Sequence, residues 1–193
     1  MSIYPDEEPL EQARARYFEE NGFGADGGYS GPWFYVGWKW LAVPLPNAAS
    51  RVRAVRLHDF HHIATGYRTT WRGEAEIGAW ELAGGCGDYY PAWVLNLYSF
   101  AVGLAIAPRR LWGAFVRGRR CRNLYHLGFD DRWLQQPVGE LRSRLGLPGA
   151  ASEPLGNDRK AFVLTAAAAL LQSAVTAAPF AVVLLILAAC LRR

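Results

Sequence analysis

Residues 48–66 of this chain read AASRVRAVRLHDFHHIATG, a pattern that predicts one helix. Asn47, which precedes the segment, is a residue type that caps helix starts, and Gly66 is typical of a helix end. We therefore predict a helix from about Ala48 to Thr65. Its histidines and its aspartate make it the centre of a predicted site.

Three side chains of this helix are good metal ligands: His58, Asp59 and His62. Successive helix residues are about 100° apart, so the two histidines share a face and Asp59 lies at the edge of the same arc. Glu74 follows after eleven intervening residues. Two imidazoles and two carboxylates suit a divalent ion such as zinc, iron, manganese or cobalt, with positions left for water or substrate. The alternative is a polar helix face whose histidines happen to be four residues apart, and the spacing of all four residues favours a metal site.

The helix that carries Glu74 is predicted to run from about Gly73 to Gly84. Gly78 and Glu81 lie on nearly the same face as Glu74, so a notch without a side chain adjoins the predicted metal. A flat ring could enter this notch, and close helix packing explains Gly78 equally well. On the first helix, His61 is interpreted as a residue that supports a ligand or packs in the core.

The composition fits one globular domain attached to a membrane. The 193 residues are 51% apolar and 13% aromatic, which argues against disorder. Residues 161–191 contain no charged side chain and are bounded by Lys160 and Arg192, as in a membrane-spanning helix. Such a helix would extend about 46 Å, which suffices for one pass and not for two. Pro179 is its predicted kink, and Gln172 begins a mildly polar stripe that faces a partner helix or bonds its own backbone.

The expected location is a membrane, with a single C-terminal span and a cytoplasmic N-terminal domain. The acidic start of the chain, Asp6 to Glu8, lacks the basic and apolar regions of a secretory signal. The three cysteines are odd in number and lack C-x-x-C spacing, and Cys190 falls in the apolar run. We therefore expect neither a disulfide nor a cysteine metal site.

Residues 109–122 contain six arginines and no acidic side chain, interleaved with apolar residues such as Leu111 and Phe115. This predicts an amphipathic basic helix suited to an anionic membrane surface. Nucleic acid is the competing partner, but a C-terminal span already brings this helix to lipid, so we expect no nucleic acid. A solvated arginine face is the simpler alternative.

The predicted fold class is all-α: a compact helical domain with a two-helix metal site, plus one C-terminal transmembrane helix. Further helices are expected at 8–20, 91–107 and 138–145. The aromatic segment 33–40 either covers an apolar ligand, lies at lipid headgroup level or packs in the core. The predicted organisation is 1–47 (N-terminal helix, glycine-rich linker and aromatic segment), 48–147 (helical metal-binding domain), 148–160 (linker) and 161–191 (transmembrane anchor).

The ligand motif resembles the H-D-x-x-H-x11-E signature of the coenzyme Q (ubiquinone) biosynthesis protein 4 family. His58, Asp59, His62 and Glu74 match it without a spacing error. Downstream, the chain is similar to the family in a Leu-Trp basic helix and a closing segment, so the resemblance covers roughly residues 51–147. The residues that carry this second part are Leu111, Trp112, Trp133, Pro137, Leu141, Arg142 and Leu145.

The resemblance implies that these four ligands are also the catalytic residues and that zinc is the first candidate ion. The implied reaction is an oxidative decarboxylation at ring carbon 1 of a polyprenyl hydroxybenzoate, in ubiquinone or a related prenylated quinone. Such a metal-dependent lyase would work with a lipid membrane and with other enzymes of quinone biosynthesis. The alternative is a membrane-anchored lipid-binding scaffold for those enzymes, without its own catalysis. HD-type phosphohydrolases and membrane di-iron hydroxylases need more histidines than this chain places near the motif.

Overall fold

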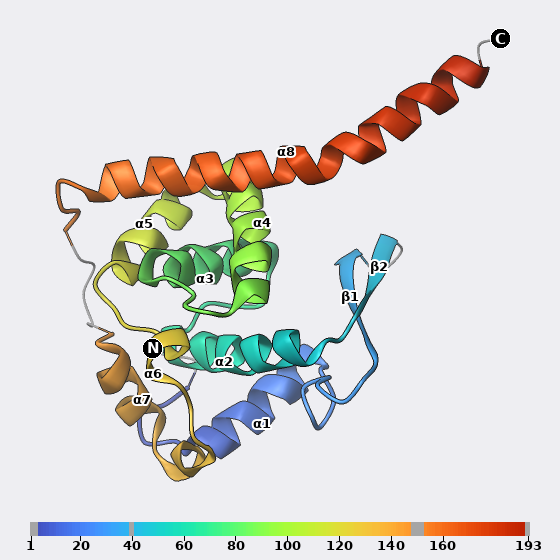
Figure 1. The fold of residues 1–193 in the computed structure, drawn as a ribbon. Helices are drawn as coiled ribbons and strands as arrows, with labels where there is room; N and C mark the ends of the chain where they lie inside the picture. The colour runs from blue at the N-terminus through green and yellow to red at the C-terminus, as the bar shows by residue number, and fades with distance from the viewer. Residues whose placement is uncertain (1–3, 39–40, 148–152, 192–193) are drawn as a thin grey trace.

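The computed structural model describes residues 4–38, 41–147 and 153–191, so Lys39, Trp40, Arg192, Arg193 and the first part of the predicted linker (148–152) lie outside it. The described chain is mostly helical, as predicted, with one two-stranded sheet (Figure 1). The helices are α1 (Leu10–Asn21), α2 (Ala49–Thr65), α3 (Trp71–Gly84), α4 (Tyr90–Ile106), α5 (Pro108–Gly118), α6 (Leu124–Leu127), the 3-10 helix η1 (Asp131–Gln135), α7 (Val138–Leu145) and α8 (Asp158–Leu191).

The two helices that carry the predicted ligands, α2 and α3, are joined by a turn that is fixed at both ends. Gly66 follows α2 with a φ of 78°, and its N–H donates to the carbonyl oxygen of His62. Thr70 precedes α3, and its hydroxyl accepts a hydrogen bond from the N–H of Gly73. Positive φ and a hydroxyl cap are the local signals that end one helix and begin the next. The turn thereby sets the last turn of α2 opposite the first turn of α3.

Asn47 does not cap α2, in contrast to the sequence prediction. The residue at the cap position is Ala48, and the side chain of Asn47 turns back to the glycine-rich segment. Its Nδ2 donates to the carbonyl oxygens of Gly28, Tyr29 and Gly31. Asn47 therefore ties this segment to the start of α2.

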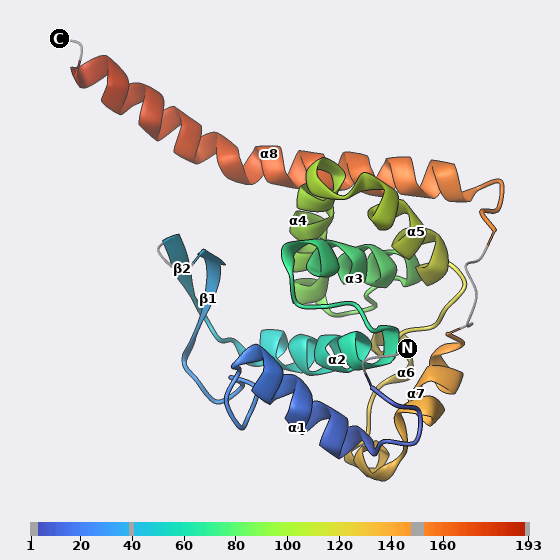
Figure 2. The same cartoon turned by 180° about the vertical axis from the view of Figure 1, so that it is seen from behind.

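Helix α3 forms the centre of the domain, packed against α4 and α5, while α1 and α7 cover α2 on the other side (Figures 1 and 2). Helix α1 contributes to the core, with Leu10, Tyr17 and Phe18 buried. A close approach at Gly118 joins α5 to α3, because a Cβ there would lie 2.3 Å from the carbonyl oxygen of Trp80.

The aromatic segment forms a hairpin that was not predicted. Strand β1 (Trp33–Trp38) pairs antiparallel with β2 (Leu41–Pro46), and aromatic side chains favour such a strand. The hairpin projects from the helices (Figure 1). The alternation of the strand leaves Trp33 and Tyr35 exposed, while the guanidinium of Arg51 lies 3.6 Å from the ring centroid of Phe34. Trp33 and Tyr35 therefore do not pack in the core, which was one of the alternatives for this segment.

The C-terminal helix α8 begins at Asp158, before the predicted anchor, and its first part runs across the domain (Figure 1). The ring of Phe162 packs against Phe100 and Phe115. Gln172 donates to the carbonyl oxygen of Val94 on α4, whereas the hydroxyls of Ser173 and Thr176 donate to the backbone of α8 itself, so the polar stripe does both of the things expected of it. Within the described chain, residues Asp158–Ala178 are long and apolar enough to cross a membrane.

Replacing Gly118 with alanine is expected to destabilise the domain by about 1–3 kcal/mol, because the new methyl group would collide with the backbone of α3. Gly113→Ala, on the same helix, meets no described atom within 4 Å and should be neutral or stabilise by up to about 1 kcal/mol. Urea denaturation of both variants measures the difference. Equal stability would mean that α5 does not pack this closely on α3.

Candidate metal centre

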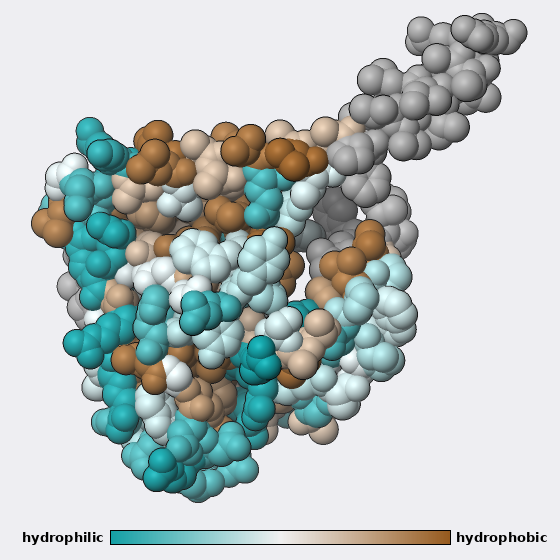
Figure 3. All heavy atoms as spheres, in the orientation of Figure 1, coloured by the Kyte–Doolittle hydropathy of each residue, from teal (hydrophilic) through white to brown (hydrophobic). Residues whose placement is uncertain are grey.

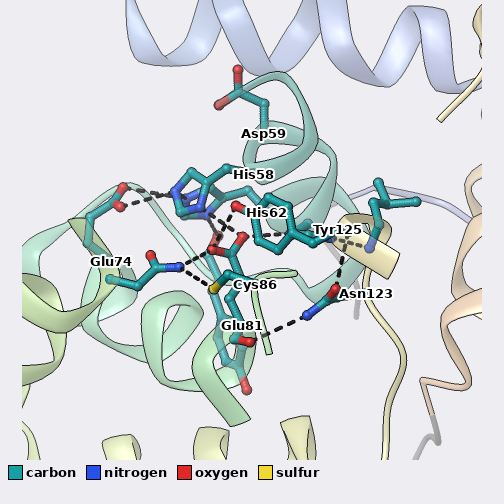
Figure 4. Close-up of polar contacts among 12 residues, drawn as sticks. His58, Asp59, His62, Glu74, Glu81, Cys86, Asn123 and Tyr125 are labelled. Atoms are coloured by element: carbon teal, nitrogen blue, oxygen red, sulfur yellow. Dashed lines mark hydrogen bonds and ion pairs between the residues drawn. The ribbon is translucent and has the colours of Figure 1, made fainter. Parts of the chain in front are cut away.

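His58, His62 and Glu74 point their ligand atoms at one another (Figure 4). The two Nε2 atoms are 3.1 Å apart, and each lies 3.5 Å from one carboxylate oxygen of Glu74. In a tetrahedral site with bonds of about 2.0–2.1 Å, ligand atoms are about 3.3 Å apart. The three side chains are therefore spaced to hold one divalent ion.

The hydrogen bonds behind the two imidazoles fix which nitrogen carries the proton. Nδ1 of His58 lies 2.9 Å from a carboxylate oxygen of Glu81, and Nδ1 of His62 lies 2.8 Å from the carbonyl oxygen of Tyr67. Both partners are acceptors, so each Nδ1 carries the hydrogen and donates it. Each Nε2 then presents a lone pair to the shared space, as a metal ligand requires.

The charges around the group attract a cation. Burial lowers the pKa of His58, but the carboxylates of Glu81 and Glu74 outweigh burial and hold that pKa well above its usual value. Burial raises the pKa of Glu74, but His62 and His58 outweigh it and hold the pKa of this carboxyl below its usual range. A proton or a metal ion can supply the positive charge that this arrangement favours.

Glu81 is a buried carboxylate that orients His58 through a hydrogen bond. The sequence pattern did not predict this role. One oxygen accepts from Nδ1 of both His58 and His61, the latter at 2.6 Å. The other accepts from Nδ2 of Asn96 and from the hydroxyl of Tyr125. Burial raises the pKa of Glu81, but His58 and His61 outweigh it and keep this pKa below its usual range. The spacing of seven from Glu74 was the available signal, since residues two turns apart share a face.

His61 packs in the core, as one of its two sequence-based interpretations expected, and its polar partner is Glu81 instead of one of the three candidate ligands. It is fully buried, and its Nε2 accepts from the backbone N–H of Leu124 at 2.8 Å. Its Nδ1 must then carry the hydrogen that is donated to Glu81. Burial lowers the pKa of His61, which agrees with a neutral ring.

Asp59 is not brought into the group that His58, His62 and Glu74 form, although the sequence predicted it as a fourth ligand. Its carboxylate is turned away from them (Figure 4) and accepts hydrogen bonds from Tyr29 at 2.5 Å and Tyr17 at 3.3 Å. The reason is helix geometry: a residue next to His58 lies about 100° around the helix, whereas His62 is one turn on. Asp59 instead ties α1 and the glycine-rich segment to α2.

Of the two explanations that the sequence left open for Gly78, close helix packing is the one that the structure supports. The notch at Gly78 is filled by α4, because a Cβ there would lie 2.2 Å from the hydroxyl oxygen of Ser99. A pocket of about 370 Å³ lies on the side of Tyr17 and Tyr67. Its nearest described link to the three candidate ligands is the ring of Tyr17, which stacks on His62. Its lining residues are Tyr4, Tyr17, Glu20, Asn21, Tyr67, Arg68, Thr69 and Thr70.

Two imidazoles and one carboxylate are the donor set of catalytic zinc sites and of non-haem iron oxygenases, both of which keep coordination positions open. The side chain of Glu74 is 35% exposed, so the group can be reached from outside the domain. A metal ion held by these three side chains alone would therefore keep further coordination positions.

Comparison of the chain with protein-family models, with curated proteins and with solved structures finds no match.

Glu81→Gln is expected to weaken metal binding tenfold to a hundredfold, because the carboxylate that orients His58 is lost. It should also destabilise the protein by roughly 2–3 kcal/mol at neutral pH. Since the folded pKa of Glu81 lies below its unfolded value of about 4.3, this difference should shrink as the pH falls below about 4. Chelator competition and denaturation at several pH values measure both effects. Glu76→Gln on the same helix is the control, and equal behaviour of the two variants would remove Glu81 from the site.

Asp59→Asn is expected to keep its metal with an affinity within a few-fold of wild type, because the carboxylate faces Tyr17 and Tyr29. His62→Ala should lose the metal, and His126→Ala, an exposed histidine on α6, should retain it. Metal content by mass spectrometry of the purified full-length variants gives the comparison. A loss in Asp59→Asn as complete as in His62→Ala would make Asp59 a ligand after all.

Proposed function

We propose that this chain is a membrane-associated metalloenzyme of ubiquinone or related prenylated quinone biosynthesis. The proposed reaction is oxidative decarboxylation at ring carbon 1 of a polyprenyl hydroxybenzoate. The observation that carries the proposal is the convergence of His58, His62 and Glu74, whose ligand atoms all lie within 4.8 Å of one another. The spacing of these residues, with Asp59, is what resembles the coenzyme Q biosynthesis protein 4 family.

The residues of the chain would prepare the site before substrate enters. Glu81 and the carbonyl of Tyr67 hold the two imidazoles with Nε2 directed at the shared point. The ring of Tyr17 stacks on His62 and closes one side. A divalent ion held there would act as a Lewis acid that stabilises negative charge on the ring as carbon dioxide leaves, with molecular oxygen as the oxidant and the source of the new ring hydroxyl.

The pocket on the side of Tyr17 and Tyr67 supports an aromatic head group as the part of the substrate that is bound. Its volume of about 370 Å³ is near the lower end for ligand sites, and tyrosines contribute to its walls. Phenol rings offer both flat apolar faces and hydroxyl groups to a hydroxylated aromatic ring. The prenyl tail of such a substrate would extend to the membrane with which α8 associates.

Zinc and iron are both proposed as the ion, for different reasons. Zinc is the ion that the family resemblance implies, whereas the same donor set serves iron in oxygen chemistry. An oxidative reaction suits the redox-active ion, and a Lewis-acid contribution suits either. Manganese and cobalt accept the same ligands.

The proposal is tested by conversion of substrate. Purified wild type, with its metal content measured, is expected to convert a polyprenyl hydroxybenzoate in detergent and air into the decarboxylated quinol, measured by mass spectrometry. Glu74→Gln should form at least a hundredfold less product, because one ligand is lost. Glu76→Gln, two residues along α3, should match wild type.

Absence of metal from the purified wild type would refute the proposal. If wild type holds metal and co-purifies with a prenylated phenol but does not convert it, the alternative gains support. That alternative is a membrane-anchored lipid-binding scaffold, which the large apolar surface of α8 also favours.

A further inference from the structure

Two polar contacts hold the first part of helix α8 against the domain, one at the start of the helix and one fourteen residues later. At its start, the buried carboxylate of Asp158 pairs with Arg120 at 2.6 Å and with Arg119 at 3.4 Å. Fourteen residues later, Gln172 donates to the carbonyl oxygen of Val94 at 2.9 Å. Between these points the ring of Phe162 inserts among the aromatic rings of α4 and α5. This part of α8 is therefore a component of the domain.

The two faces of this docked segment differ from those of a helix on a soluble domain. Apart from Phe162, the face that meets the domain contains small and polar residues, among them Thr165, Ala169 and Gln172. The face that points outward is aliphatic and between 55% and 66% exposed. Its large residues are Val163, Leu164, Leu170, Leu171 and Val175. A helix on a soluble domain buries its apolar side, so this surface requires an apolar environment.

The docked segment cannot cross a bilayer while it remains on the domain. Residues 158–173 extend about 24 Å along the surface of α4 and α5, so a perpendicular helix would carry those helices into the hydrocarbon. In both ribbon views the remainder of α8 bends away from the domain (Figures 1 and 2). The bilayer that fits both parts lies over α8, on the side opposite the domain.

Charge at the start of the helix fits lipid headgroups. Arg159 and Lys160 are exposed immediately before the aliphatic face begins. Hydrophobic residues follow along α8 at the upper edge of the molecule, with hydrophilic ones at its beginning (Figure 3). An apolar face beside basic residues is the pattern of helices that lie on anionic membranes.

Helix α5, which the sequence predicted for this purpose, does not offer an apolar face. Its Leu111, Ala114 and Phe115 are buried in the domain, which leaves chiefly its arginines at the surface. One of these already has a partner within the protein, since Arg110 pairs with Glu76. The apolar membrane contact therefore comes from α8.

We propose that the outward face of α8, from Val163 to Val175, lies flat in the interface of an anionic bilayer. The rest of the helix enters the bilayer from this in-plane segment. The predicted single span over 161–191 is then replaced by a helix that lies along the membrane first and dips into it second. Like the proposed function, this inference requires that the protein binds a membrane. It does not depend on the metal or on the reaction.

Spin labels at two positions test this orientation in the full-length protein. Leu164→Cys and Leu171→Cys are made in a chain with Cys121 and Cys190 replaced by serine, and the labelled proteins are bound to vesicles of phosphatidylcholine with an anionic phospholipid. The two residues are two turns apart, about 10.5 Å along the axis. For a flat helix both labels should show the same shallow depth from oxygen and nickel-complex accessibility. A label at Leu127 on α6 should remain in water.

A depth difference of about 10 Å between the two labels would show a spanning helix and overturn the proposal. Labels that stay in water would overturn it as well. Spin-spin broadening between copies, together with exclusion of oxygen, would show that a second copy of the chain covers this face instead of lipid. The metal content of each labelled protein is also measured. A loss of metal would bear on the proposed function, whereas the label depths bear on the membrane orientation.

Discussion

The arrangement of the site depends on one buried carboxylate, that of Glu81. Its two oxygens accept four hydrogen bonds, which join α2, α4 and the segment at Tyr125 to α3. A carboxylate without exposed surface is costly unless it is fully paired, so these partners are constrained to remain together. The same bonds turn His58 so that its Nε2 faces His62 and Glu74. Glu81 thus links the stability of the domain to the direction of a ligand.

Much of the centre was predictable because its signals are local. The glycine after α2, the threonine before α3 and the spacing of His58, His62 and Glu74 are read within one helical hairpin, and the structure brings these three side chains together. Asp59 shows the limit of such reasoning, since its direction depends on Tyr17 and Tyr29, which lie far away in the sequence. The family and the reaction that the motif suggests stay proposals.

The parts that were not predicted are decided by tertiary contacts. The aromatic segment has strand-forming residues, yet its pairing depends on a proline-containing partner that does not read as a strand. The apolar tail was predicted from composition, but composition does not show that half of it docks on the domain. That docking involves Asp158 and Gln172, two polar residues whose partners lie elsewhere in the domain.

The turn between α2 and α3 has a consequence for how the protein folds. His58 and Glu74 are separated by only sixteen residues, whereas Glu81 reaches forward forty-four residues to Tyr125. Contacts of short sequence separation form fastest, so the ligand hairpin can close while the later helices are still being synthesised. In a nascent chain the three side chains of the candidate centre would meet first, and the hydrogen bond from Tyr125 to Glu81 would form only once the later helices are made. The hairpin therefore folds before the buried carboxylate behind it has all its partners.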